Sequence, residues 1–334
     1  MIDIVEDSGF FQQLTAQQLS SDGSVRLLHD SADGWSQLYL ADRHGRFRML
    51  KVLKPEFRGN PLYEELLKKE FEIGYTLSHP GICEIYGFHE SAELGNCIEM
   101  EWIDGDSLSN LISRHRITKK LAVKLFSQIC NAVQYIHSRQ IVHRDLKPSN
   151  IMVTHNGQNI KIIDFGLSDS DSFSILKAPA GTTNFAAPEL LQGKECDHRI
   201  DIYSLGKILD LLGIMCPRTV TKCIKTNPKD RFTEPINILQ SLKLEIIYRK
   251  LAVSSLCAIL ILVLVCILKN INTPFVHSNV NPTNPVAYIE TDSIPPKDSS
   301  ITSVPDTEMI YSTELIDELF RQATDMVVST QEQN

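Results

Sequence analysis

The segment VHRDLKPSNIMV, Val142–Val153, constrains this chain more than any other, because it sets three chemical groups at fixed spacing. Asp145 supplies a carboxylate, Lys147 a cation two positions later, and Asn150 an amide oxygen three positions beyond that. The segment IIDFGLS follows and contributes the carboxylate of Asp164. A base for a hydroxyl proton, a cation and two oxygen donors for magnesium are what a phosphoryl-transfer site requires. The pattern predicts such a site, with Asp145 as the base.

The two expected metal ligands lie at the ends of two short apolar runs that flank Asn156-Gly157. An Asn-Gly pair between such runs is a strong signal for a tight β-hairpin. The hairpin brings Asn150 and Asp164 to the same end. Oxygen donors from a few side chains, completed by phosphates, suit Mg²⁺.

The region before this motif alternates between apolar and polar residues in short runs, beginning at Val25. Such alternation predicts an antiparallel sheet. Lys51 lies in the third run, MLKVLKPEF, whereas Lys54 ends that run and is interpreted as a surface charge. A helical pattern follows, and it places Glu70 nine residues before the sequence HPGI that begins at His79.

In this order the motifs resemble those of the eukaryotic-like serine/threonine protein kinases, over about residues 25–242. The resemblance implies an α+β, two-lobed protein kinase-like fold, with a small β-rich N-lobe at 25–104 and a helical C-lobe at 105–243. It also implies a buried ion pair between Glu189 and Arg231. Only 41 residues separate these two, so the lower part of the C-lobe, which docks substrates in the family, is expected to be reduced.

The resemblance also assigns residues to ATP. Lys51 is expected to grip the phosphates and Glu70 to pair with it, with Glu72 as the local competitor for that role. Backbone groups of Glu101 and Ile103 are expected to face the adenine. Backbone contacts tolerate many side chains, so this last assignment depends on register alone.

The loop that covers the nucleotide departs from the family. Ser31, Asp33 and Ser36 occupy the three positions where the family has glycine, and Gly34 is one place away. Glycines allow backbone amides to approach phosphates closely, and a carboxylate at Asp33 would repel them. The departure implies weaker binding of ATP.

Three functions follow from these observations. The first is an active kinase that uses ATP and Mg²⁺ to phosphorylate serine or threonine in protein substrates, itself included. The second is a pseudokinase that acts as a membrane-anchored binding scaffold. The third is a kinase of small molecules, against which Lys147, the serine-rich segment before Glu189 and the sequence AAPE argue.

Other polar residues receive supporting roles. Asp106 could cap the helix that starts near Ser107 or reach the ribose of the nucleotide, and the cap is the more economical interpretation. His137 and His143 are interpreted as structural, and Asp201 is expected to accept backbone amides of the catalytic loop.

The segment from Asp164 to Glu189 is the candidate activation segment. A phosphate on one of its hydroxyls could pair with Arg144 and order the loop. The candidate hydroxyls are those of Ser168, Ser170, Ser172, Ser174, Thr182 and Thr183.

Leu251–Leu268 is a run of 18 residues without a charge, which as a helix would span about 27 Å. A buried core helix is the alternative, but the run is apolar on every face and follows a finished domain. Arg249-Lys250 precede it, so residues 1–250 are expected on the cytoplasmic side. The first residues lack a signal peptide, and with the C-terminal anchor this resembles bacterial receptor-type kinases of the inner membrane.

The flanking segments complete the prediction. Residues 1–24 are a polar lead-in, and residues 269–334 form an acidic extracytoplasmic tail whose helical pattern at 308–328 could support a homodimer or bind a partner. Residues 1–250 hold 30 Lys and Arg against 31 Asp and Glu, a balance that gives no sign of nucleic-acid binding. The eight cysteines lack paired spacing, which favours reduced thiols over disulfides or a metal site.

Overall fold

The computed structural model describes residues 25–30, 34–43, 45–165, 184–194 and 196–271. They fall into two compact units, divided after Ile246. The predictions for Ser31, Asp33, the hydroxyls of the activation segment, the lead-in 1–24 and the helix 308–328 lie outside the described residues.

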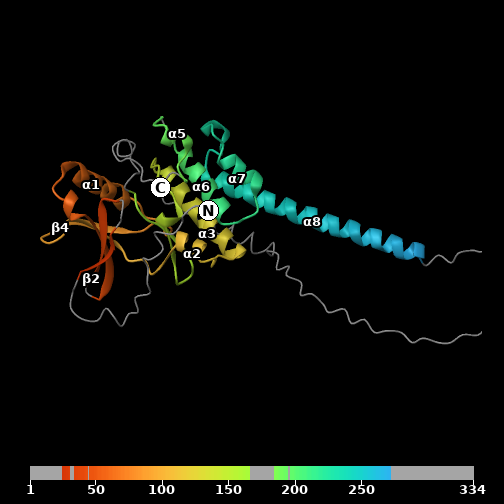
Figure 1. Ribbon diagram of the computed structural model, residues 1–334, viewed down its shortest axis with the longest axis horizontal. Helices are drawn as coiled ribbons and strands as arrows, with labels where there is room; N and C mark the ends of the chain where they lie inside the picture. Colours follow the sequence, from red (N-terminus) through yellow and green to blue (C-terminus); the bar gives the residue numbers. More distant parts are fainter. Residues whose placement is uncertain (1–24, 31–33, 44, 166–183, 195, 272–334) are drawn as a thin grey trace, which may run out of the picture. The chain divides into compact units, whose positions relative to one another are not determined.

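The N-terminal part of the first unit is a five-stranded antiparallel sheet in the order β1-β2-β3-β5-β4 (Figure 1). Its strands are β1 Arg26–Asp30, β2 Ser36–Arg43, β3 Arg46–Leu53, β4 Ile85–Ser91 and β5 Gly95–Glu101. A 3₁₀ turn, Pro55–Phe57, and helix α1, Pro61–Tyr75, connect β3 to β4. Strand β3 lies between β2 and β5, which buries Lys51 within the sheet.

Helix α1 starts where Asn60 and Pro61 dictate. The Asn60 side chain accepts a hydrogen bond from Leu62 N, and a proline at the first helical position costs no backbone hydrogen bond. Leu66, Leu67 and Glu70 lie on its buried face. Gly74 completes that face, because a Cβ there would collide with Ile85 of β4.

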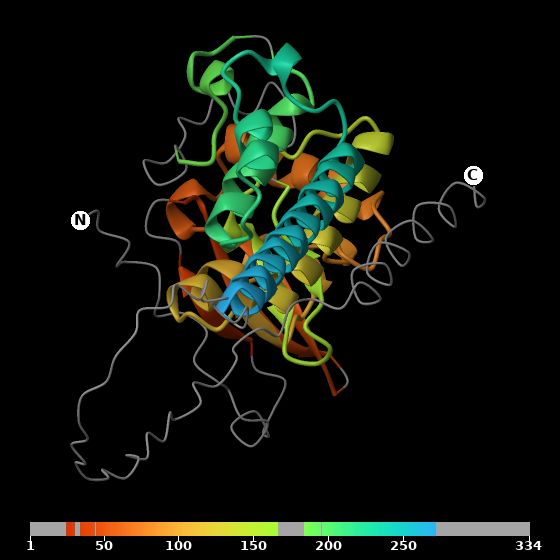
Figure 2. The same cartoon turned by 90° about the vertical axis from the view of Figure 1, so that its right-hand side faces the viewer.

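The C-terminal part of the first unit is helical around α3, whose apolar residues are almost completely buried. Helix α6 and the first turns of α8 lie along α3 (Figure 2). A small sheet in the order β6-β7-β8 carries the catalytic loop. The elements are β6 Gly105–Ser107, α2 Leu108–Ser113, α3 Lys119–Ser138, η3 Pro148–Asn150, β7 Ile151–Thr154, β8 Ile160–Ile162, α5 Pro188–Leu191, α6 Arg199–Leu211, α7 Pro217–Cys223, η5 Pro228–Asp230 and α8 Pro235–Ile271.

The lower part of this helical region is short. Only residues 212–216 connect α6 to α7. Gly206 of α6 lets α7 pack directly against it, because a Cβ at this position would collide with Cys223. The space that a further helix would occupy is therefore closed by α7 itself.

Helix α8 differs from the prediction at its start. It runs from Pro235 to Ile271 as one element, instead of beginning anew at Leu251. Residues 243–250 contain no Gly or Pro, so nothing in them ends a helix. Within the described part of the chain this is the helix long and apolar enough to cross a membrane, with a mean hydropathy of 3.1 in its apolar window and none of that window buried.

Candidate active site

Lys51 is the centre of a buried charge cluster. Its Nζ lies 2.6 Å from Glu70 Oε1 and 3.0 Å from Asp164 Oδ1, and the Lys51 and Glu70 side chains are 8% and 2% exposed. Glu72, the competitor for the pairing, lies instead on the exposed side of α1, 3.8 Å from Lys68. The register against HPGI thus chose the right glutamate for this ion pair.

The burial and charges of this cluster shift the pKa values of Lys51 and Glu70. Burial opposes the charge of Lys51, but the carboxylates of Asp164 and Glu70 outweigh it and raise the pKa of Lys51 above its usual value. Burial also raises the pKa of Glu70 to about 7, against the opposing effect of Lys51. The lysine therefore stays charged and faces the half-exposed Asp164.

The catalytic loop holds Asp145 by one of its two carboxylate oxygens. Oδ2 lies 2.9 Å from Lys147 Nζ and accepts a hydrogen bond of 3.0 Å from Asn150 Nδ2, which also donates to the Asp145 carbonyl at 2.9 Å. Oδ1 is buried and has no hydrogen-bond partner among the described residues. Burial raises the pKa of Asp145, and Lys147 opposes that rise. The free oxygen is an acceptor suited to a substrate hydroxyl.

The loop that carries Asp145 is held in place by Asp201, which is fully buried in α6. Its carboxylate accepts hydrogen bonds from His143 N at 2.8 Å and Arg144 N at 2.9 Å, and it lies 2.8 Å from His137 Nε2. Arg144 itself has a φ of 66°, an uncommon conformation for a residue with a side chain. Such strain persists only where the surroundings enforce it, and Asp201 does so here.

The segment that carries Asp164 is fixed in a similar way. Asp164 has a φ of 71°, and the next residue, Phe165, is buried with its ring 5.3 Å from that of His143. Ile163 N donates to the Asn150 carbonyl at 2.9 Å. Asn150 and Asp164 are thus joined at one end of the β7–β8 hairpin. One carboxylate and one amide oxygen, with phosphates to complete the shell, fit Mg²⁺.

The residues predicted to face adenine lie between the two lobes. Glu101 ends β5, and its Oε2 is held by Lys161 Nζ at 2.7 Å and Glu84 N at 3.2 Å. Ile103 is buried and packs with Cys83 and Met152. Both side chains are engaged by the protein, which leaves backbone groups as the means of recognition at this position.

The β1–β2 hairpin, here called the roof, is tied at its base by a residue that the sequence did not single out. Asp30 accepts a hydrogen bond of 2.9 Å from Gln37 Nε2 and lies 3.2 Å from Lys54 Nζ. Lys54 is buried, so its interpretation as a surface charge is wrong. The strand carries it back toward β1, where Asp30 compensates its charge.

Trp35 and Ser36 lie near the tip of the roof, where β2 begins. The ring of Trp35 lies 5.4 Å from Lys51 Nζ, a distance suited to a cation–π contact, and its carbonyl accepts from Lys54 N at 3.0 Å. Ser36 opens β2 and pairs with Leu53 of β3. A tryptophan beside the expected glycine positions was the signal for this contact, but only the folded sheet places it above the lysine.

The prediction that Asp106 caps α2 is wrong. The cap is Ser107, whose hydroxyl accepts from Asn110 N at 3.2 Å. Asp106 belongs to β6, and its carboxylate lies 3.4 Å from His155 Nε2. His155 Nδ1 in turn lies 2.9 Å from Asp104, so one imidazole joins two carboxylates at the junction of the lobes.

The predicted pair between Glu189 and Arg231 is present. Two hydrogen bonds of 2.6 and 2.8 Å join the guanidinium to the carboxylate, and both residues are buried. Arg231 also donates to the carbonyls of Lys225, Thr226 and Arg199. All sides of the buried cation are thereby satisfied.

The profile of the protein kinase domain family matches residues 36–219, more than half of the chain. The chain belongs to the protein kinase family. The α+β, two-lobed fold that the sequence predicted is confirmed by this match and by the structure.

The relatives of this chain include serine/threonine-protein kinases of bacteria. The chain is 34% identical over 185 residues to the serine/threonine-protein kinase PknA of Mycobacterium tuberculosis, covering 52% of this chain and 43% of PknA. It is 32% identical over 188 residues to PknB of Mycolicibacterium smegmatis, covering 53% of this chain and 30% of PknB. The chain thus spans less than half the length of these relatives.

Solved structures agree on the fold. The kinase domain of PknI from Mycobacterium tuberculosis superposes with a TM-score of 0.53 at 24% identity, covering 70% of this chain and all of that domain. At this identity the likeness establishes the architecture only.

Proposed function

We propose that this chain transfers the γ-phosphoryl group of ATP to serine or threonine hydroxyls of protein substrates, including its own. The presence of two charge clusters at the candidate site supports this proposal. Lys51 is paired with both Glu70 and Asp164, and Asp145 presents a buried, unpartnered Oδ1 beside Lys147. A pseudokinase would have no need of a buried carboxylate oxygen that has no hydrogen-bond partner among the described residues.

Each residue has a distinct task in this proposal. Lys51 binds the nucleotide phosphates, and backbone groups of Glu101 and Ile103 orient the adenine. Asp145 Oδ1 accepts the hydrogen bond of the attacking hydroxyl and takes its proton as the new ester bond forms. Lys147 places a positive charge against the transferring group. Mg²⁺, held by Asn150 and Asp164, would neutralise the charge that develops on the phosphates.

The apolar window of α8 supports a second part of the proposal, that the chain crosses a membrane once. Arg249 and Lys250 precede the window, and the positive-inside tendency places the kinase unit on the cytoplasmic side, where ATP is available. Tyr248, which is 64% exposed, suits the interface between water and lipid. A bacterial inner membrane is the location we propose, with the tail from 269 onward on the far side.

The test is incorporation of labelled γ-phosphate by the full chain in lipid nanodiscs, with Mg²⁺ and millimolar ATP. We expect label on serine or threonine that falls at least about 10²-fold in Asp145→Asn and is also lost in Lys51→Ala. Asp210→Asn, an exposed carboxylate on α6, is the matched control and should keep full activity. Binding of ATP without transfer by the folded wild type would favour the pseudokinase, and label on an added metabolite but not on protein would favour a small-molecule kinase.

A further inference from the structure

The positive charge of this chain is concentrated just before the apolar window. Residues 217–250 contain 8 Lys and Arg against 3 Asp and Glu, a net charge of +5. Residues 1–216 contain 22 against 28, a net charge of −6. The first 250 residues thus have nearly equal numbers of positive and negative charges, but the excess positive charge is concentrated in residues 217–250.

Helix α7 and the residues after it display much of this charge on one face. Thr219, Val220 and Cys223 form the buried face of α7. Arg218 and Lys222 are exposed, and their spacing of four residues puts them on a common side of α7. Lys225, also exposed, follows two residues after the end of the helix. We name these three residues the basic face.

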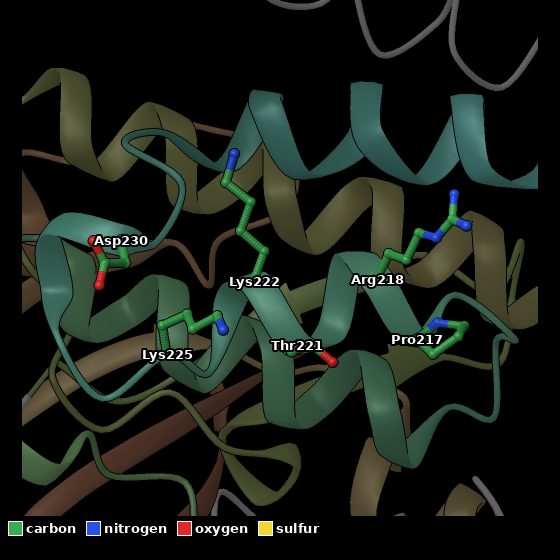
Figure 3. Close-up of a pocket in the computed structure, with 6 residues that line it drawn as sticks. All are labelled: Pro217, Arg218, Thr221, Lys222, Lys225 and Asp230. Carbon is green, nitrogen blue, oxygen red and sulfur yellow. The ribbon is translucent and has the colours of Figure 1, made fainter.

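The basic face lines a shallow hollow of about 530 Å³, together with Pro217, Thr221 and Asp230 (Figure 3). The guanidinium of Arg218 and the ammonium of Lys222 extend to the same side of α7 in this view. Lys222 Nζ lies 4.3 Å from the centre of the Phe232 ring, which holds the lysine in place and leaves its charge uncompensated. Within the described part of the chain, none of the three cations of the basic face forms an ion pair.

The start of α7 is bound to the part of α8 that approaches the apolar window. Glu245 accepts hydrogen bonds from Arg218 N at 3.2 Å, Thr219 N at 3.0 Å and Thr219 Oγ1 at 2.9 Å. Glu245 precedes Leu251 by six residues, a length of chain that spans no more than about 21 Å. The covalent chain therefore limits how far the start of the apolar window can lie from Glu245, to which the start of α7 is bound.

We propose that the basic face binds the phosphate groups of anionic phospholipids in the membrane that α8 crosses, and so holds the kinase unit against the lipid surface. This inference rests on the membrane anchoring in the proposed function. Clusters of Lys and Arg beside a membrane-spanning helix are attracted to anionic headgroups. Asp230 lines the same hollow, but within the described residues it forms no ion pair with the three cations, which stay exposed.

The experiment compares the full chain in nanodiscs of phosphatidylglycerol and of phosphatidylcholine. Lysine acetylation rates are read at each site by mass spectrometry, with Lys68 and Lys120, both exposed, as internal controls. We expect Lys222 and Lys225 to react about fivefold more slowly in phosphatidylglycerol, with Lys68 and Lys120 unchanged. Equal rates in the two lipids would overturn the proposal.

A pair of charge variants provides a second readout that does not depend on lysine chemistry. Hydrogen exchange of the amides at 218–225 should slow in phosphatidylglycerol for the wild type and for Lys68→Gln/Lys69→Gln/Lys120→Gln. It should not slow for Arg218→Gln/Lys222→Gln/Lys225→Gln. The same slowing produced by an acidic peptide in phosphatidylcholine discs would identify a protein docking site instead and overturn the proposal.

Failure of the anchoring itself is a separate result. A chain that alkaline carbonate releases from vesicles is not membrane-spanning, which contradicts the proposed location. A chain that resists carbonate but shows no dependence on lipid charge contradicts only the role of the basic face.

Discussion

The two sides of the candidate ATP site are held by carboxylates that differ in their exposure to solvent. On the C-lobe side, fully buried Asp201 fixes the backbone of the catalytic loop with two amide hydrogen bonds. On the N-lobe side, the base of the roof is fixed by Asp30, whose side chain is 50% exposed. The interactions of Asp201 lie in a low-dielectric interior, whereas water screens those of Asp30. We therefore expect the interactions of Asp201 to be the stronger ones.

This difference matches what each side has to do. The catalytic loop must place one oxygen of Asp145 against one hydroxyl, and small displacements are costly. In the proposed function the roof would contact phosphates through backbone amides, which many sequences can supply. A chain of this family can therefore lose its roof glycines while its catalytic loop keeps every chemical group.

The largest expected effect comes from the buried side of the comparison. Arg231→Met leaves the Glu189 carboxylate buried without its partner, and we expect a loss of about 3–5 kcal/mol in the free energy of unfolding. Urea denaturation of the full chain measures it. Arg116→Met, at an exposed position, is the control and should change stability by less than about 0.5 kcal/mol. A similar loss in both variants would show that burial of this ion pair is not what matters.

Asp201→Asn tests the anchor of the catalytic loop. The amide of asparagine would turn a donor toward backbone N–H groups, which displaces the loop that carries Asp145. We expect kcat to fall about 10²-fold with little change in the KM for ATP. Steady-state kinetics separate the two, and an unchanged kcat would mean that the loop keeps its position without this carboxylate.

Asp33→Gly tests the roof. The sequence aligns Asp33 with a glycine position of the family's phosphate loop. On that prediction, removing its carboxylate should lower the KM for ATP about fivefold, a gain of about 1 kcal/mol. The kcat should stay nearly constant. Asp42→Gly, beside the turn between β2 and β3, serves as the control for a glycine introduced elsewhere in the same sheet. A weaker affinity in Asp33→Gly would show that Asp33 serves the nucleotide instead of opposing it.

The smallest effect is expected at the junction of the lobes. Burial lowers the pKa of His155, but Asp104 and Asp106 outweigh it and raise the pKa above 6.5. The folded state then binds the proton more tightly than the unfolded state, so this contribution is complete below pH 6.5 and is lost as pH rises through the folded pKa. We expect the stability difference between wild type and His155→Gln to shrink from pH 6 to pH 8. A difference that is constant with pH would mean that His155 carries no charge in the pair.

Several features of the site followed from local sequence. The spacing of Asp145, Lys147 and Asn150 within one loop leaves little freedom in where their side chains can lie. The Asn-Gly turn brings Asp164 back to Asn150 because a two-stranded hairpin has only one register that buries its apolar runs. Glu70 could be chosen over Glu72 because residues two apart on a helix face different sides.

The charge pairs that the sequence missed join segments far apart in the chain. His155 meets Asp104 and Asp106 across 51 and 49 residues, and Lys161 meets Glu101 across 60. No periodicity marks such pairs, since each residue alone is an ordinary polar group on a loop or strand. Lys54 was misread for the same reason, because its partner Asp30 lies in β1, separated from β3 by β2 in the sheet.

By itself, then, the sequence determined the chemistry of this protein, the order of its lobes and the apolar window of α8. These depend on groups close together in the chain, whose relative positions covalent geometry and regular secondary structure restrict. The tertiary structure alone decided which charges are buried, which carboxylate anchors each loop, and that α7 is left with an uncovered basic face. Burial and the pairing of distant charges are properties of packing, and packing exists only once the chain has folded.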